Sequence, residues 1–582
     1  MKRTILFWLL TFSILQVVQG IALEPYKALE EKYSGKDIFN TQALDWDMEN
    51  IKITSNSYSL KSDIIIKGLI LNNGNNTINY FDIVYQVNDE IPVSARIDGV
   101  ALDFGVKYAY GHPIKWRADQ TGSFKVKVWI ENINGNEDMN HSNDTIIKTI
   151  IIGDPVPDIL DSYLTYVNKK TIIGNSTKGV NQPRDLDFHP ILSRYELWVI
   201  NKGTEASGGS TVKFSKAGLP GQTSKLQKDG NSWHFMSLPT GIAFSENENF
   251  ATSTGVYDAN HNGGSPFTGP SLWSSDPAIY AITPPGGNGS HLDMLHQSPY
   301  CMGICSENEN VFWVTDGNSN DIVRYDFEED HGPGQEDHSD GIIRRYPDAE
   351  FYAESTHDVV SHLVLDKATN WLYYVSTADK KVKRLNIKTG SFGYNIPPYE
   401  QVSEYSAYLN ATVEDVIIDG LTQPAGIELF NDRLLVSDFS TGDINIYNIS
   451  SGSITFMGKV ATGNPGIMGI KIGPDGKIWY VNKTLSQVIR LDTTGVLITN
   501  NNNLTDNNSF SIFPNPASST ITVDSKNIPE FIQLSSLTNG IIKYLKPNST
   551  TSHINMAGLI PGLYLVRILI DNQIMNKIII KM

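Results

Sequence analysis

Between about residues 170 and 495 the sequence repeats itself six times, and this repeat constrains the fold more than any other feature. Each copy begins with a short apolar segment, and the copies start about 45–65 residues apart, which leaves room for four strands and a loop. A four-stranded unit cannot bury both of its faces alone, so consecutive units are expected to stack radially around a channel. The apolar segments are residues 183–188, 239–244, 301–305, 360–365, 424–429 and 467–472.

Five of the copies continue into a second strand-like run, and several add a third. The combined phrase P-x-G-I … G-x-[IL]-W-V-x-[DN] … I-x-R-[LY]-D resembles the NHL and related six-bladed β-propellers. The resemblance covers residues 170–495 and implies a six-bladed β-propeller there. The alternatives are a pair of β-sandwiches or a TIM barrel, but few amphipathic helical stretches separate the strands, which disfavours the barrel.

The segment before the repeat, residues 50–152, contains short runs in which apolar and polar residues alternate. Turn clusters rich in Asn and Gly separate these runs, as at residues 72–76 and 134–136. This pattern predicts an antiparallel β-sandwich of about 100 residues. It resembles the immunoglobulin-like adhesion modules of bacterial surface proteins. Residues 154–158, with two prolines, are expected to link this domain to the repeat.

The end of the chain carries the most specific motifs. An Asn-rich linker is expected at residues 496–508, and a small β-sandwich at 509–582. Three blocks there, at residues 510–517, 558–568 and 577–582, closely resemble the type A C-terminal sorting domain of the type IX secretion system. The resemblance implies a Gram-negative bacterium, the type IX secretion machinery as a partner, and a mature protein that is secreted or attached to the outer cell surface.

The beginning of the chain has the pattern of a secretory signal peptide over residues 1–20. Basic Lys2 and Arg3 precede an apolar run from Ile5 to Val18, and Gly20 provides a small residue at the cleavage site. The alternative is a membrane anchor, but the run is shorter than the ~20 residues that span a bilayer. We therefore expect export to the periplasm and a mature chain without a transmembrane segment.

The net charge of −17 and the pI near 5.2 argue against nucleic acid as a partner, because nucleic acids are bound through basic patches. Eight of the 12 histidines fall between His234 and His362. One Gly-rich loop there combines imidazoles with carboxylates, which are ligands suited to zinc, while its Asp-rich part alone would suit calcium. The alternative is a solvated acidic loop. The candidate metal ligands are Asp330, His331, Asp337, His338 and Asp340.

Long loops on a rigid propeller are common binding surfaces, and two insertions here carry His and Trp side chains. Aligned on the repeat, three further residues are expected to face the channel. The candidate ligand-binding residues are His261, Trp273, His291, His296, His362, Arg184 and Asp185. Propeller-type amidating lyases carry histidines at equivalent positions of three blades. Here only His362 occupies such a position, which counts against that activity.

The expected fold class is all-β: an N-terminal immunoglobulin-like β-sandwich, a six-bladed β-propeller and a small C-terminal β-sandwich sorting domain. The sequence does not identify a reaction, and no G-x-S-x-G, P-loop or dinucleotide motif is present. The favoured function is therefore non-catalytic binding of an extracellular protein or glycan by the propeller loops. The alternatives are a metal-dependent lyase or hydrolase at the channel mouth, and a purely structural surface component.

Overall fold

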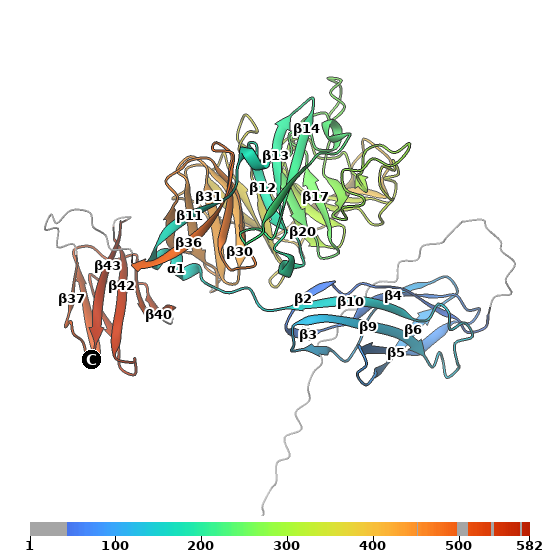
Figure 1. Ribbon diagram of the computed structural model, residues 1–582, viewed down its shortest axis with the longest axis horizontal. Helices are drawn as coiled ribbons and strands as arrows, with labels where there is room; N and C mark the ends of the chain where they lie inside the picture. The colour runs from blue at the N-terminus through green and yellow to red at the C-terminus, as the bar shows by residue number, and fades with distance from the viewer. Residues whose placement is uncertain (1–43, 451, 498–509, 537–539, 571–572) are drawn as a thin grey trace, which may run out of the picture. The chain divides into compact units, whose positions relative to one another are not determined.

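The computed structural model describes residues 44–450, 452–497, 510–536, 540–570 and 573–582. The predicted signal peptide lies outside these residues, as does the predicted linker apart from residues 496 and 497, which belong to a strand. The described chain is almost entirely β, as the sequence predicts (Figure 1). Its short helical segments are α1 (Leu160–Thr165), η1 (Ser176–Lys178), η2 (Leu192–Arg194) and α2 (Ser232–Phe235).

The chain divides into two compact units. The first ends at Ile150 and the second begins at Ile151, except that the short segment 56–60 belongs with the second. No described helix has the length and apolar character needed to cross a membrane.

Two sheets make the N-terminal β-sandwich. In β9, buried Val126, Val128 and Ile130 alternate with partly or fully exposed side chains, which is the pattern of a strand with one face on a core. The smaller sheet is β1 (Met48–Ile53), β4 (Lys67–Asn72) and β7 (Lys107–Gly111), and β3 (Ser62–Ile64) pairs with β8 (Trp116–Ala118). The larger sheet has the order β2 (Tyr58–Leu60), β10 (Ile146–Gly153), β9 (Gly122–Glu131), β5 (Ile78–Val87) and β6 (Val93–Leu102).

Strands β11 to β36 of the described chain form six sheets, which we call blades 1 to 6. Blade 1 has the strand order β12 (Pro183–Phe188), β13 (Leu197–Thr204), β14 (Gly208–Ser215), β15 (Thr223–Gln227). Blade 2 has the order β16 (Gly241–Phe244), β17 (Asn249–Ser253), β18 (Ser271–Ser274), β19 (Asp293–Met294). Blade 3 begins with β20 (Cys301–Asn308), β21 (Val311–Asp316), β22 (Asp321–Asp326), β23 (Ile342–Tyr346). Blade 4 has the order β24 (Leu363–Asp366), β25 (Trp371–Ser376), β26 (Lys381–Asn386), β29 (Val413–Ile417). Blade 5 has the order β30 (Pro424–Phe430), β31 (Arg433–Asp438), β32 (Asp443–Asn448), β33 (Thr455–Ala461). Blade 6 has the order β34 (Ile467–Ile472), β35 (Ile478–Asn482), β36 (Gln487–Leu497), β11 (Tyr166–Gly174).

The first strands of the six blades form a closed ring. Each packs against the first strand of the next blade, and β34 of blade 6 packs against β12 of blade 1. The second strand of each blade is therefore enclosed by neighbouring blades on both faces, which explains why its sequence is a continuous apolar run such as Leu197–Ile200. The structure is thus a six-bladed β-propeller, in agreement with the repeat (Figure 1).

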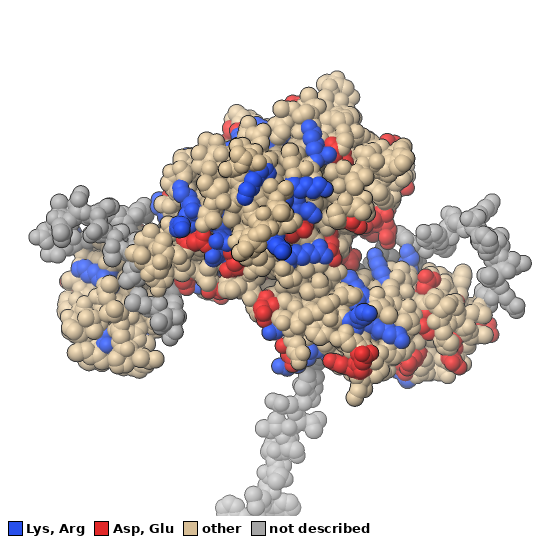
Figure 2. All heavy atoms as spheres, in the orientation of Figure 1, with Lys and Arg blue, Asp and Glu red and all other residues tan. Residues whose placement is uncertain are grey.

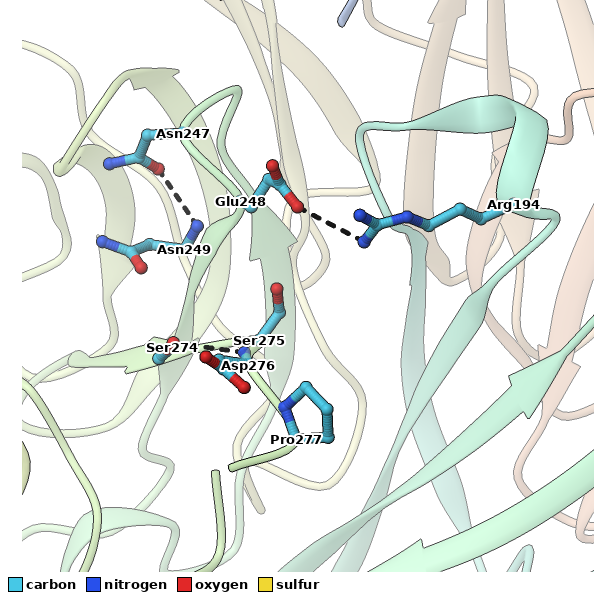
Figure 3. A pocket seen from close by; sticks show the side chains of 8 residues that line it. All are labelled: Arg194, Asn247, Glu248, Asn249, Ser274, Ser275, Asp276 and Pro277. Atoms are coloured by element: carbon cyan, nitrogen blue, oxygen red, sulfur yellow. Dashed lines mark hydrogen bonds and ion pairs between the residues drawn. The ribbon is translucent and has the colours of Figure 1, made fainter. Parts of the chain in front are cut away.

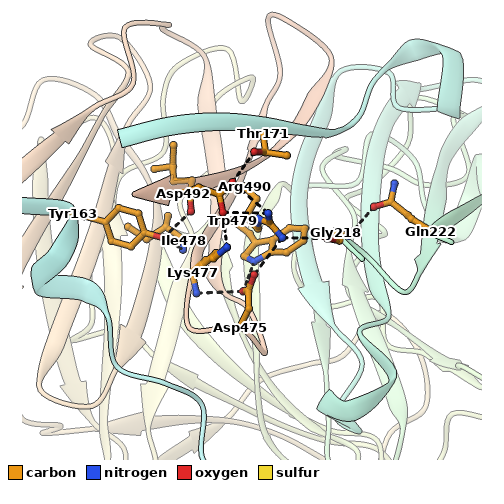
Figure 4. A network of polar contacts seen from close by, with 11 residues as sticks. Tyr163, Thr171, Gly218, Gln222, Asp475, Lys477, Ile478, Trp479, Arg490 and Asp492 are labelled. Carbon is orange, nitrogen blue, oxygen red and sulfur yellow. Dashed lines mark hydrogen bonds and ion pairs between the residues drawn. The ribbon is translucent and has the colours of Figure 1, made fainter. Parts of the chain in front are cut away.

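Blade 6 closes the ring with strands from both ends of the propeller. Strand β11 precedes blade 1 in the chain, yet it pairs antiparallel with β36 as the outermost strand of blade 6. A network of polar contacts surrounds this junction (Figure 4). Thr171 Oγ1 donates to Asp492 Oδ2 at 2.6 Å, and Arg490 Nη1 reaches the carbonyl oxygen of Gly218 in blade 1 at 3.3 Å.

Blade 3 is wider than the repeat predicts. The segment between β26 and β29 carries β27 (Ser391–Asn395) and β28 (Glu404–Leu409), and β28 adds in parallel to the outer edge of β23. Arg345 of β23 bonds the Tyr405 hydroxyl of this added hairpin at 3.0 Å. The insertion thus covers the exposed edge of blade 3 with two further strands.

The C-terminal domain is a small β-sandwich, as predicted. Apolar side chains from both sheets, among them Ile521, Val523, Leu534 and Val566, form its core. One sheet contains β37 (Phe510–Phe513), β38 (Thr520–Ser525) and β41 (Thr551–Asn555), and the other contains β40 (Gly540–Leu545), β39 (Phe531–Ser536), β42 (Gly562–Ile570) and β43 (Gln573–Lys581).

Candidate functional site

A cavity of about 230 Å³ lies at the end of the propeller where the first strands of the blades begin. Arg184 opens β12, while Tyr300 directly precedes β20 and Asp358 precedes β24. Because these strands form the inner ring, the cavity is at a mouth of the central channel. The lining residues are Arg184, Lys202, Glu205, Leu238, Gly255, Val256, Tyr257, Tyr300, Thr356, His357 and Asp358.

Aromatic rings form one wall of this channel-mouth pocket. The rings of Tyr300 and His357 are stacked, with centroids 4.2 Å apart and planes within 2° of parallel, and Tyr257 lies 5.7 Å from Tyr300. Tyr300 and His357 both have positive φ, at 54° and 55°, which bulky residues rarely adopt. Together with Tyr257, these two rings give the pocket an aromatic wall.

Three cations surround one carboxylate in the wall of the pocket. The carboxylate of Asp358 receives hydrogen bonds from Arg184 at 3.2 Å and Lys202 at 2.7 Å, and it forms an ion pair with Lys483. Although partial burial opposes it, bonding to these lysines and Arg184 holds the pKa of Asp358 well below its usual range. One carboxylate thus shares three cations, while the carboxylates of Glu205 at the rim and of Glu354, which bonds Thr356 and the Asp358 amide, lie beside them.

Arg184 is almost fully buried, and its Nε–H has no hydrogen-bond partner among the described residues. Burial lowers the pKa of its guanidinium to about 10, so that the group remains charged at neutral pH. A buried donor without a partner is costly unless a ligand or water satisfies it. The sequence prediction that Arg184 faces the channel thus fits its place in the pocket wall.

Three other predicted ligand residues lie near Arg184. Two of them are buried deeper than the pocket, and the third lies at its rim. Asp185 and His362 are buried, with His362 Nε2 3.7 Å from Asp185 Oδ1. Burial raises the pKa of Asp185 to about 7 and lowers that of His362 to about 3, so the imidazole of His362 is neutral at pH 7. His261 lies at the rim, where Nδ1 is 3.3 Å from Oε1 of Glu205.

Trp273 occupies a different environment. It is fully buried in the core of blade 2, and its Nε1 donates to Thr252 Oγ1 at 2.9 Å. A ring with no exposed surface packs blades together, and this placement gives a ligand no access to it.

The remaining histidines gather away from the channel mouth, around β19, the outermost strand of blade 2 in the sheet order. His291 and His296 flank this strand, and His338 comes from the loop after β22. The ring centroid of His296 lies 5.2 Å from that of His234 and 6.0 Å from that of His338, and His291 lies 6.3 Å from His338. These histidines therefore converge at the outer edge of a blade and not at the channel mouth.

Two of these imidazoles face each other directly. His234 Nε2 lies 3.0 Å from His296 Nε2, while their Nδ1 atoms bond the carbonyl oxygen of Ala259 at 3.1 Å and a carboxylate oxygen of Glu400 at 2.8 Å. Oxygen acceptors at both Nδ1 atoms require both to carry hydrogen, so the contact between the two Nε2 atoms is a hydrogen bond only when one ring carries a second proton. Burial and the nearby His296 lower the pKa of His234 to about 4, so His234 is neutral at pH 7.

This lowered pKa predicts acid sensitivity. Between about pH 6.5 and pH 4 the unfolded chain binds a proton at His234 that the folded chain does not, so the free energy of unfolding falls as the pH falls. The full effect is about 3 kcal/mol. In H234Q, which can still donate to Ala259, we expect urea unfolding in EDTA to show a shallower loss of stability between pH 7 and pH 4.5. The exposed control H553Q should keep the wild-type slope, and an unchanged slope in H234Q would contradict the assignment.

The five candidate metal ligands do not form one cluster. Asp330 accepts hydrogen bonds from the amides of Asn249 and Asn310, and exposed Asp337 accepts from Ser339 within its own loop. His331 and Asp340 do meet, with Nε2 and Oδ1 2.8 Å apart. His338 is turned toward Asp293 of β19, at 2.5 Å from its Oδ1.

Asp293 and Glu400 are the acidic partners that the sequence analysis did not select. Asp293 precedes the candidate ligands of residues 330–340 by almost 40 residues. Glu400 lies between β27 and β28, in the unpredicted insertion that adds to blade 3. The one available signal is the spacing of His291, Asp293 and His296, which places titratable side chains around one short strand.

A second cavity, of about 300 Å³, lies beside the first residue of β17 and the last residue of β18 (Figure 3). Its side chains are polar, and Arg194 spans it toward Glu248 at 3.3 Å. The lining residues are Arg194, Asn247, Glu248, Asn249, Ser274, Ser275, Asp276 and Pro277.

On the face seen in Figure 2, basic and acidic side chains are mixed over the propeller. The channel-mouth pocket therefore stands out by its stacked rings and its three cations around one carboxylate.

Residues 511–581 match the family model described as secretion system C-terminal sorting domain. The chain is accordingly exported by type IX secretion to the cell surface or the extracellular space. Comparison with curated protein sequences gave no match.

Several solved structures are similar in fold. An auxiliary nutrient binding protein from Bacteroides ovatus is 10% identical, with 77% of this chain and 98% of that chain covered and a TM-score of 0.36. The Cps50 (Swd1) β-propeller domain from Myceliophteria thermophila is 8% identical over 56% of this chain and 100% of that chain, with a TM-score of 0.32. A nidogen/laminin complex gives 12% identity, 60% and 95% coverage and a TM-score of 0.33.

Proposed function

We propose that this exported protein binds an extracellular ligand, without catalysis, in the channel-mouth pocket of an NHL-like propeller. The observation that carries the proposal is the pocket itself, in which loops of several blades bring stacked aromatic rings together with buried, incompletely bonded Arg184. Concave sites with aromatic walls and a few fixed polar groups are the usual form of small-ligand sites. The extracellular destination supplies the setting for such binding.

The chemistry of the pocket favours an acidic glycan over a protein segment. Tyr257 and Tyr300 offer flat apolar faces with polar hydroxyl tips, which suit the alternating apolar and hydroxylated faces of a sugar ring. The cluster of three cations at Asp358 offers donors for carboxylate or sulfate groups, because charge-assisted bonds to Lys and Arg are strong. A cavity of about 230 Å³ is of a size for one or two sugar residues rather than a folded partner.

The lyase or hydrolase alternative needs a catalytic group of metal ligands at this mouth. His261, His357 and His362 are the histidines near it, none of them in a group of potential metal ligands among the described residues, and the other imidazoles of this region gather around β19. The binding function therefore accounts for the pocket with fewer assumptions.

The test is a screen of neutral and acidic glycans and of peptides against the mature chain, followed by titration calorimetry of the hits. In Y257A we expect affinity for an acidic glycan to fall about threefold to tenfold, because one aromatic contact is worth about 0.5–1.5 kcal/mol. Tyr257 is 37% exposed, so its loss should leave the fold intact. In K202A, the affinity should fall and should depend less steeply on salt concentration than in the wild type, since a screened charge contact is lost.

The matched control is Y394A, which removes an exposed tyrosine from β27, far from the pocket lining. Affinity in Y394A should equal that of the wild type. Equal affinity in Y257A and wild type would contradict the proposed site, and hits restricted to peptides would contradict the glycan assignment.

A further inference from the structure

Three potential metal ligands from two blades meet outside the channel-mouth pocket. Asp293 lies in β19 of blade 2, whereas His331 and Asp340 belong to residues 327–341, the loop between β22 and β23 that we call the blade-3 loop. One donor atom of each side chain lies within 4.8 Å of the donors of the other two. Separation in sequence and convergence in space make this group different from a solvated acidic loop.

The contacts of Asp293 leave one oxygen of its buried carboxylate without a partner among the described residues. Its side chain is fully buried, and Oδ1 accepts hydrogen bonds from His338 Nδ1 and from the Met294 amide, both at 2.5 Å. The other oxygen, Oδ2, is buried and accepts no hydrogen bond from any described residue. A buried carboxylate oxygen without a partner is costly, and a bound cation would satisfy it.

We propose that Asp293, His331 and Asp340 bind a divalent transition-metal ion, of which zinc is the representative. One imidazole and two carboxylates are a donor set that zinc accepts, and three protein ligands leave a position for an oxygen atom of water or another ligand. Calcium, in contrast, takes six to eight oxygen ligands and no imidazole. The two carboxylates also balance the charge of a divalent ion.

His338 has a supporting part in this site. Its Nδ1–H bonds the same carboxylate of Asp293 that would face the metal, an arrangement that fixes the orientation of a ligating carboxylate. It is therefore a positioning residue, and the ion would fasten the blade-3 loop to the outer strand of blade 2. The predicted ligands Asp330 and Asp337 take no part, because their carboxylates lie outside the group of converging donor atoms.

The experiment uses the full mature chain after removal of metals with EDTA. Titration calorimetry with zinc chloride and elemental analysis after dialysis should both give one equivalent of zinc in the wild type. H331A and D340N change partly exposed loop side chains, which leaves the blade core intact, and each should bind zinc at least tenfold more weakly. D337N, in the same loop, should bind zinc as the wild type does.

A second readout follows the loop itself. Zinc should slow proteolytic cleavage within residues 327–341 of the wild type and of D337N, but not of H331A or D340N. Several results would overturn the proposal: no zinc bound by the wild type, equal affinity in H331A and D340N, or calcium bound in place of zinc. Loss of zinc in H296Q together with unchanged binding in H331A would also overturn it, because the ion would then belong to the facing pair His234 and His296.

Discussion

Replacing Arg345 by alanine is expected to lower the free energy of unfolding of the propeller by about 3–5 kcal/mol. Its guanidinium donates to Asp316 at 2.6 Å and to both oxygens of Asp321, and it also bonds Tyr405 and the carbonyl of Gln297. The side chains of Arg345, Asp316 and Asp321 are all more than nine-tenths buried. Alanine would leave two buried carboxylates without their cation, which is far costlier than losing an exposed pair.

The neighbouring Arg344 provides the matched control. It lies in the same strand and makes a bidentate pair with Glu404 at 2.9 and 3.0 Å, but its side chain is 31% exposed. R344A should therefore cost at most about 1 kcal/mol. Urea unfolding followed by tryptophan fluorescence measures both variants. Equal losses in R345A and R344A would show that the buried network does not hold the blade-3 insertion in place.

Removal of residues 160–174, which form α1 and β11, is expected to prevent the propeller from folding. Leu160, Tyr163, Leu164 and Ile173 are buried there, and burying four large side chains contributes about 6–12 kcal/mol. That sum is comparable to the whole stability of a typical domain, about 5–15 kcal/mol. Deletion would also expose the edge of β36 and remove the Tyr163 hydroxyl that donates to the Leu491 carbonyl at 2.7 Å.

The control for this deletion is a chain that begins at residue 154 and so lacks the first unit but retains β11. We expect it to be soluble and to unfold cooperatively, whereas the chain that begins at residue 175 should aggregate or lack a melting transition by circular dichroism. Two chains with the same melting transition would show that β11 is not needed to close blade 6.

The repeat predicts most of the propeller because each copy must supply strands that are buried in the same way. Runs such as Leu434–Val436 must be apolar on both sides, since neighbouring blades cover both faces. Closure by β11 is harder to predict, because one strand of blade 6 is separated in sequence from the other three. The β27–β28 hairpin leaves no trace in the repeat, because it adds to blade 3 from an insertion within blade 4.

The residues of the candidate sites also differ in whether the repeat could predict them. Arg184 could be selected because it occupies a repeated position on an inner strand. Tyr257, Tyr300 and Asp358 lie in loops of unequal length, whose spacing carries no information on which blades meet at the mouth. In the histidine-rich region the sequence shows which potential ligands are abundant, but Asp293 reaches His331 only through the packing of two blades.

Amide hydrogen exchange of the wild-type chain tests ring closure most directly. If β11 is the outer strand of a closed blade 6, the amides of residues 168–174 that bond β36 should exchange slowly and together with those of β35, because local opening would break the ring. Exchange of residues 168–174 at the rate of the blade-3 loop, while β35 remains protected, would contradict a closed ring and the channel mouth that depends on it.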